Sequence, residues 1–159
     1  MAIATCEVMA NAQKQYFTQA HDGGRAKRYA LKFVSDQGKQ NGLYWPVAQG
    51  QAVSPLGVLG DFAKAVSNAG DQPPLFNGYH YRILARPGAF AILAYPAEYR
   101  NSGIMSFIVG KDGAVYQKDL GETTAELAPA MTAPRTSQQP RPATKSVAAS
   151  RPTVATKAK

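Results

Sequence analysis

Two histidines, His21 and His80, are the residues of this sequence whose type could serve as an ordinary general base near neutral pH. His21 falls in the phrase HDGG at the expected end of a helix, where a capping role is favoured over catalysis. His80 lies between two tyrosines on an expected strand, which favours a solvent-facing residue of a sheet. Neither histidine is therefore predicted to be catalytic.

The candidate nucleophiles and metal ligands give no stronger signal. Cys6, the single cysteine, falls on the apolar face of an expected helix and is predicted to be a buried structural thiol. Ser54, Ser102 and Ser106 do not lie in the G-x-S-x-G phrase that exposes a nucleophilic serine. The spacings H-E-x-x-H and C-x-x-C, which bind zinc, do not occur. The sequence predicts no catalytic residue, no metal site and no cofactor.

The phrase GKDG, Gly110 to Gly113, has the composition either of a phosphate-binding loop or of a turn between two strands. A phosphate loop continues into a helix whose first N–H groups face the anion. Here a strand-like alternation resumes at once in Val115-Tyr116-Gln117. Asp-Gly is also a strong hairpin signal, so the phrase predicts a turn.

A second group of polar and aromatic residues could bind a ligand. The phrase AYPAEYRNSG joins two expected strands, and loops on a sheet often carry recognition residues. The alternative interpretation is structural: Asn101 and Gly103 would form a left-handed turn, and Trp45 would anchor the connection GLYWP to the core. A binding site would require Trp45 to lie beside Tyr95. The predicted site consists of Trp45, Tyr95, Glu98, Tyr99, Arg100 and Asn101.

Hydrophobic periodicity predicts the elements that would position these residues. Apolar side chains at helical spacing predict helices over Ile3–Ala20 and Ala26–Val34, and Ser54-Pro55 predicts the start of another that stops near Gly70. Alternation after Pro73-Pro74 predicts strands, with Phe90–Tyr95 in a central position. We expect an α+β fold in which the N-terminal helices pack on one face of an antiparallel sheet of about four strands. The predicted strands are Gly78–Leu84, Ala89–Tyr95, Ile104–Val109 and Ala114–Lys118.

The end of the chain differs from the rest in composition. Residues 1–128 are expected to form a single domain and residues 129–159 a disordered tail, because the latter are rich in Pro, Ala, Ser and Thr. Most of the formal charge of +8 falls in this tail, so we expect weak polyanion binding at most and no specific nucleic-acid partner. The sequence has no apolar run long enough for a membrane span. The basic residues of the tail are Arg135, Arg141, Lys145, Arg151, Lys157 and Lys159.

Several phrases resemble the bacterial domain-of-unknown-function family 2950: GKQNGLYWP, SPLG, FNGYHYRILA, AYPAEYRNSG and DGAVYQKDLG. The resemblance implies an exported protein of the periplasm or the cell exterior, without an assigned activity. Members normally begin with an export signal and a further N-terminal region. The resemblance therefore implies an N-terminally shortened chain, in which we expect no signal peptide. Members also have a longer glycine-rich connection where this sequence has ARPG. The predicted architecture is also similar to the globular heads of type IV pilins and pseudopilins, by analogy only.

Three functions are consistent with these residues. The first is a noncatalytic envelope or extracellular domain, a pilin-like interaction or assembly module whose partner is a protein or another envelope component. The second is an enzyme that acts on an envelope component, with Glu98 as its carboxylate. The third is weak binding of polyanions through the basic tail.

Overall fold

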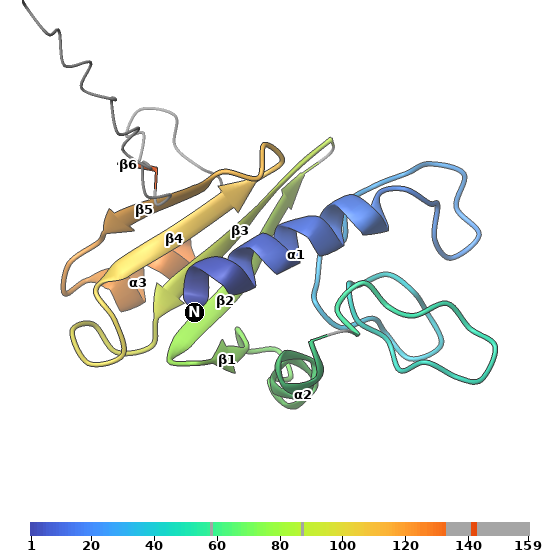
Figure 1. Cartoon of the computed structure of the whole chain (residues 1–159), viewed down its shortest axis with the longest axis horizontal. Coiled ribbons are helices and arrows are strands. Elements are labelled where there is room, and N and C mark those ends of the chain that lie inside the picture. Colours follow the sequence, from blue (N-terminus) through green and yellow to red (C-terminus); the bar gives the residue numbers. More distant parts are fainter. Residues whose placement is uncertain (58, 87, 133–140, 143–159) are drawn as a thin grey trace, which may run out of the picture.

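The computed structural model describes residues 1–57, 59–86, 88–132 and 141–142. An antiparallel sheet forms its centre, with helix α1 (Ala2–Tyr16) across one face and helix α3 (Thr124–Ala130) on the other (Figure 1). The strands follow the order β1-β2-β3-β4-β5-β6, so neighbours in the sequence are neighbours in the sheet. Their bounds are β1 Leu75–Phe76, β2 Tyr79–Arg86, β3 Ala89–Pro96, β4 Met105–Gly110, β5 Val115–Asp119 and β6 Arg141–Pro142.

Strand β3 occupies the middle of the sheet, as its apolar sequence predicts. It pairs with β2 along its whole length, from Tyr79 opposite Pro96 to Arg86 opposite Ala89. On its other side it pairs with β4. Every residue of β3 except Ala89 is buried. The α+β class and the four predicted strands are therefore confirmed, and β1 and β6 are short additions at the edges.

The phrase GKDG forms a turn between β4 and β5, and this prediction is confirmed. The Gly113 N–H donates to the carbonyl of Gly110 at 3.0 Å, and Asp112 Oδ1 accepts from the Ala114 N–H at 3.2 Å. Gly113 has a φ of +78°, a backbone conformation that glycine adopts without a steric penalty. A strand follows directly, so the N–H groups of a helix N-terminus do not converge here.

The two faces of the sheet carry separate hydrophobic clusters. The larger cluster lies under α1 and includes Cys6, Met9, Tyr81 and Ile92. Helix α2 (Gly60–Asn68) contributes to the same cluster through Phe62 and Val66, so both N-terminal helices pack on one face, as predicted. The smaller cluster, on the α3 side of the sheet, contains Leu84, Ala91, Leu93, Tyr95 and Ala128.

The predicted helix over Ala26–Val34 is wrong. This segment is irregular and wraps past the C-terminal half of α1, although Tyr29, Ala30 and Phe33 are buried at the spacing that suggested a helix. Its backbone finds a partner in the side chain of Gln13, which is fully buried. Gln13 Nε2 donates to the Ala30 carbonyl at 2.8 Å, and Gln13 Oε1 accepts from the Ala30 N–H at 2.9 Å. Because the amide supplies both hydrogen bonds, burial of Ala30 does not require a helix.

Two other helix boundaries also differ from the prediction. Helix α1 ends at Tyr16 rather than at residue 20. Ser54-Pro55 does not begin a helix: Ser54 is buried, residues 55–57 form a turn, and α2 begins at Gly60. The Leu56 N–H donates to the carbonyl of Leu43 at 3.0 Å, which joins this turn to the preceding connection. The predicted stop at Gly70 has the expected left-handed backbone, with a φ of +59°.

Helix α3 was not predicted, because it crosses the expected boundary at residue 128. Arg82 on β2 holds its C-terminal end: Nη1 donates to the carbonyls of Ala128 at 2.9 Å and Pro129 at 2.6 Å. A guanidinium stabilises the free carbonyls of a helix end and the negative end of its dipole. Of the predicted disordered tail, residues 133–140 and 143–159 lie outside the described residues, and Arg141 and Pro142 pair with β5.

Candidate functional site

The structure does not bring the six residues of the predicted site together. Trp45 and Tyr95 are each only 5% exposed and belong to the clusters on opposite faces of the sheet. Trp45 Nε1 donates to the carbonyl of Ala52 at 3.1 Å, so the indole anchors the connection that contains it. The ring of Tyr95 packs against His80, and burial raises the pKa of its hydroxyl. The meeting of Trp45 with Tyr95 that the prediction required is not found.

The other four residues of the predicted site share one turn after β3. The Ser102 N–H donates to the Glu98 carbonyl at 2.9 Å, and the side chains of Asn101 and Glu98 are hydrogen-bonded to each other. Arg100 adopts the left-handed backbone, with a φ of +66°, whereas Asn101 and Gly103 were predicted to do so. Glu98 is thus engaged within its own turn.

Tyr99 and Arg100 attach this turn to the end of β5 and to the residues that follow it. The Tyr99 hydroxyl donates to Asp119 Oδ2 at 3.2 Å. Arg100 Nη1 lies 3.8 Å from Glu122 Oε1, and its guanidinium lies over the Tyr99 ring at 5.5 Å. These groups are solvent-exposed, so the ion pair contributes little to stability.

Both histidines and the cysteine considered for catalysis are engaged in structural contacts. His21 stacks on Tyr16 with ring centroids 3.8 Å apart, and its Nε2 is hydrogen-bonded to the Tyr16 carbonyl at 2.9 Å. His80 Nδ1 is hydrogen-bonded to the carbonyl of Pro73 at 3.1 Å. Cys6 is fully buried, and burial raises the pKa of its thiol to about 12. At neutral pH this thiol is protonated and inaccessible.

A cleft of about 520 Å³ opens at the side of the sheet, between three segments distant in the sequence. Its walls are residues 31–36 of the irregular segment, the end of α2 with the following loop from Ala69 to Pro74, and Tyr81 to Ile83 of β2. The sequence did not predict this cleft, because its first wall was interpreted as a helix. Concave sites of this volume are the usual location for ligands.

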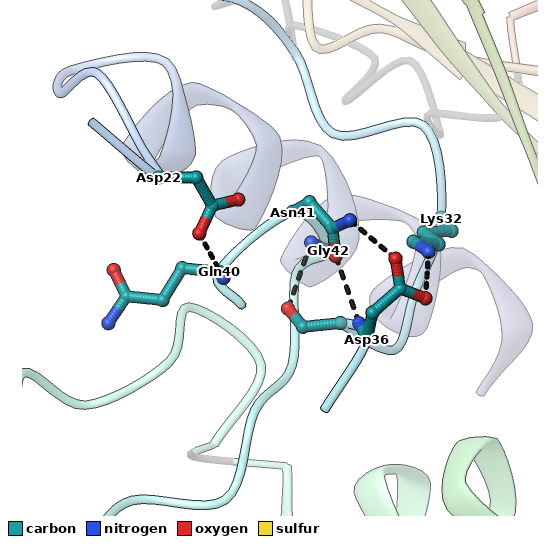
Figure 2. A network of polar contacts seen from close by, with 7 residues as sticks. Asp22, Lys32, Asp36, Gln40, Asn41 and Gly42 are labelled. Carbon is teal, nitrogen blue, oxygen red and sulfur yellow. Dashed lines mark hydrogen bonds and ion pairs between the residues drawn. The ribbon is translucent and has the colours of Figure 1, made fainter. Parts of the chain in front are cut away.

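A network of polar contacts holds the wall formed by residues 31–36 (Figure 2). Asp36 is paired with Lys32, and it shares two hydrogen bonds with Asn41: the Asp36 N–H donates to Asn41 Oδ1 at 2.9 Å, and Asn41 Nδ2 donates to Asp36 Oδ2 at 2.7 Å. Lys32, Ser35 and Asp36 all line the cleft. The network therefore fixes the position of the polar groups on this wall.

The same wall is joined to the next connection by close backbone contacts. The Gly42 N–H donates to Ser35 Oγ at 2.9 Å, and the Ser35 N–H donates to the Tyr44 carbonyl at 2.8 Å (Figure 2 shows the first of these). The Gln40 N–H donates to Asp22 Oδ1 at 2.7 Å, which ties the connection to the residues after α1. Hydrogen bonds thus fix one side of the cleft in position, although it has no regular secondary structure.

The Lys32–Asp36 pair gives a pH-dependent prediction. The hydrogen bond from Lys32, and then that from Asn41, lower the pKa of Asp36. A lowered pKa in the folded state stabilises the fold above the pKa of an unfolded aspartate, about 3.9, and this contribution is lost as the pH falls through the folded value. Lys32→Met should therefore raise the pKa of Asp36 toward the ordinary value, as measured by NMR of the carboxyl carbon.

The control for this prediction is Lys64→Met, because Lys64 pairs with Asp61 at 3.6 Å and does not line the cleft. It should leave the titration of Asp36 unchanged. An unaltered Asp36 pKa in the Lys32 variant would mean that the pair does not form in solution.

The family model described as "Protein of unknown function (DUF2950)" matches residues 1–89 and 86–140. The chain belongs to this family. The two matched ranges of this DUF2950 chain meet at the turn between β2 and β3, where the resemblance places a longer connection in other members. No curated protein and no solved structure matches it, so the likeness to pilin heads has no support from a known structure.

The described residues set two further limits on this DUF2950 domain. None of its described helices is long and apolar enough to cross a membrane. Within the same residues, no three His, Cys, Asp or Glu side chains lie close enough to hold a metal ion.

Proposed function

We propose that this chain is a noncatalytic binding domain of the bacterial envelope or cell exterior, and that it binds its partner in the cleft beside β2. The supporting observation is a cleft that combines apolar side chains with a polar wall held in place by hydrogen bonds. The described lining of the cleft contains no histidine and no cysteine, whereas His21, His80 and Cys6 lie elsewhere in structural contacts. The lining offers apolar and hydrogen-bonding groups instead, as binding sites do.

The location outside the cytoplasm rests on the family resemblance given by the phrases GKQNGLYWP and AYPAEYRNSG. A binding domain in that compartment would meet other envelope proteins and their extended segments. We expect the protein in the periplasmic or extracellular fraction of its host after osmotic shock. Recovery with a cytoplasmic marker would reject this location and leave the binding site to be tested separately.

Site-specific photo-crosslinking in intact cells tests the cleft. A photoreactive amino acid is placed at Gln72, an exposed residue that lines the cleft. The matched positions are Lys111, in the turn between β4 and β5, and Asn101, in the predicted site after β3; both are exposed and outside the described lining. We expect a discrete adduct from position 72 alone. Adducts from position 101 alone, or equally from all three, would reject the cleft as the binding site.

A further inference from the structure

Strand β2 has an open edge along the cleft. Strand β1 covers only its beginning, with Leu75 opposite His80 and Phe76 opposite Tyr79 (Figure 1). The two strands are joined by Asn77 and Gly78, with φ of +51° and +79°, which form a tight two-residue hairpin turn. The remaining residues of β2 therefore extend past the end of β1.

The hydrogen-bond pattern shows which residues of β2 face this edge. The Ala97 N–H donates to the Gly78 carbonyl at 2.9 Å, which starts the ladder with β3 at an even-numbered residue. Bonded pairs in an antiparallel ladder recur at every second residue, so Arg82 and Leu84 bond toward β3. The odd-numbered residues point the other way, and the Tyr81 N–H confirms this by donating to the Pro74 carbonyl at 3.1 Å.

Pro74 ends the cover that β1 gives to this edge. Pro74 has no N–H, so it cannot return a hydrogen bond to the Tyr81 carbonyl. Beyond this point, Ile83 and Ala85 turn their N–H and carbonyl groups away from β3, toward the side where β1 has ended and no other described strand pairs with β2. An unpaired edge of this kind is a template for another strand.

The cleft lies along this part of β2, since Tyr81 to Ile83 form one of its walls. The opposite wall includes Leu31, whose side chain is 68% exposed although it is large and apolar. The charged side chains that line the cleft differ in whether they are paired with an opposite charge. Lys32 is neutralised by Asp36, while the exposed Asp71 has no ion pair within the described part of the chain.

The guanidinium of Arg82 does not offset the charge of Asp71, because it is directed to the carbonyls at the end of α3 on the other face of the sheet. The cleft therefore combines a free strand edge, exposed apolar surface and one unpaired carboxylate. These are complementary to an extended peptide that alternates β-branched and basic side chains.

We propose that the cleft binds such a basic extended peptide, which adds to the open edge of β2 as a further strand. This inference rests on the proposed function, because it names the partner class of the same cleft. The peptide backbone would donate to the Tyr81 carbonyl and exchange hydrogen bonds with Ile83, and an apolar side chain would contact Leu31. Main-chain bonds supply affinity in this mode, and the alternate side chains supply specificity.

The test uses the full chain and the synthetic peptide acetyl-TVKVKVT-amide, followed by NMR and amide hydrogen exchange. We expect the amide of Ile83 to exchange rapidly in the free protein and to be protected on binding. The amides of Arg82 and Leu84 should be protected in both states, because they already bond to β3. Protection of Ile83 without peptide, rising with protein concentration, would show that a second copy occupies the edge and would overturn the proposal.

Two N-methylated peptides are matched controls that leave the protein unchanged. A strand paired on one side uses the backbone N–H of every second residue. N-methylation of the peptide residues that face β2 should therefore weaken binding at least about tenfold, which corresponds to one lost hydrogen bond of about 1.4 kcal/mol. N-methylation of the residues that face away from β2 should leave the affinity unchanged. Equal effects of both sets, or no effect of either, would reject strand addition.

A second pair of measurements tests whether Asp71 makes the cleft prefer a basic peptide. The peptide acetyl-TVEVEVT-amide should bind more weakly than the lysine peptide, and Asp71→Asn should reduce this difference without altering the fold, because Asp71 is exposed. An unchanged preference would reject the assigned role of Asp71.

If no peptide binds while position 72 still forms a specific adduct in cells, strand addition fails and the proposed function stands. If the lysine peptide binds to the edge of β2 but position 72 forms no adduct in cells, the edge can add a strand, and the proposed function in the cell is rejected.

Discussion

Gly42→Ala should destabilise the fold by about 3 kcal/mol, which corresponds to a fall of the thermal midpoint on the order of 10 °C. A Cβ at this position would lie 2.6 Å from the carbonyl carbon of Val34 and 2.7 Å from the nitrogen of Ser35. Both contacts are with backbone, so rotation of a side chain cannot relieve them. The strands of the sheet stay intact in this variant, and the loss should come from the wall of the cleft.

The control for Gly42 is Gly60→Ala in α2, where an added Cβ would have nothing within 4 Å. Alanine is a better helix former than glycine, so this variant should be unchanged or more stable by up to about 1 kcal/mol. Urea unfolding followed by circular dichroism measures both variants. Equal stability of the two would show that residues 34 and 42 are not in close contact in solution.

Gln13→Met should also cost about 3 kcal/mol, because it leaves the N–H and carbonyl of Ala30 buried without partners. Methionine has nearly the length of glutamine and keeps the apolar contacts, so the loss reports the two hydrogen bonds. Ala30 is only 1% exposed, so water does not replace the amide without rearrangement. The irregular segment should detach from α1 before the sheet unfolds.

The matched variant for Gln13 is Gln15→Met on the exposed side of the same helix, which should change stability by less than about 0.5 kcal/mol. Reaction of Cys6 with a thiol reagent offers a second measurement, because its thiol is inaccessible until α1 opens. Faster labelling in the Gln13 variant than in the Gln15 variant is the expected result. Identical rates and stabilities would show that the amide does not hold the segment.

The sheet was predictable because each of its signals is local. Alternating side chains, the turn at Asp112-Gly113 and the apolar run from Phe90 to Tyr95 act within a few residues, and the structure confirms all three. The segment from Ala26 to Val34 was not predictable in this way. The spacing of its buried side chains fits a helix. Its backbone is instead hydrogen-bonded at Ala30 to Gln13, which lies seventeen residues away.

The candidate site was less predictable than the fold. Trp45 and Tyr95 have the composition of a binding site, but the sheet separates them, and sequence composition alone does not show which face a connection will cover. The signal for the cleft was present in Pro73-Pro74, which precede a short strand and must leave part of its neighbour uncovered. Its polar wall could be found only once Lys32 was known to lie outside a helix, because the predicted helix over Ala26–Val34 included it.

Helix α1 lies at the start of the chain but packs against β3, β4 and β5, which end at Asp119. Its contacts with Ala30 and Gln40 can form early in synthesis, but its contacts with β5 require about a hundred further residues. Contacts so distant in the sequence slow folding, because a long loop must close before they form. The chain consequently completes its main core late, because α1 can pack on the whole sheet only after β5 has formed.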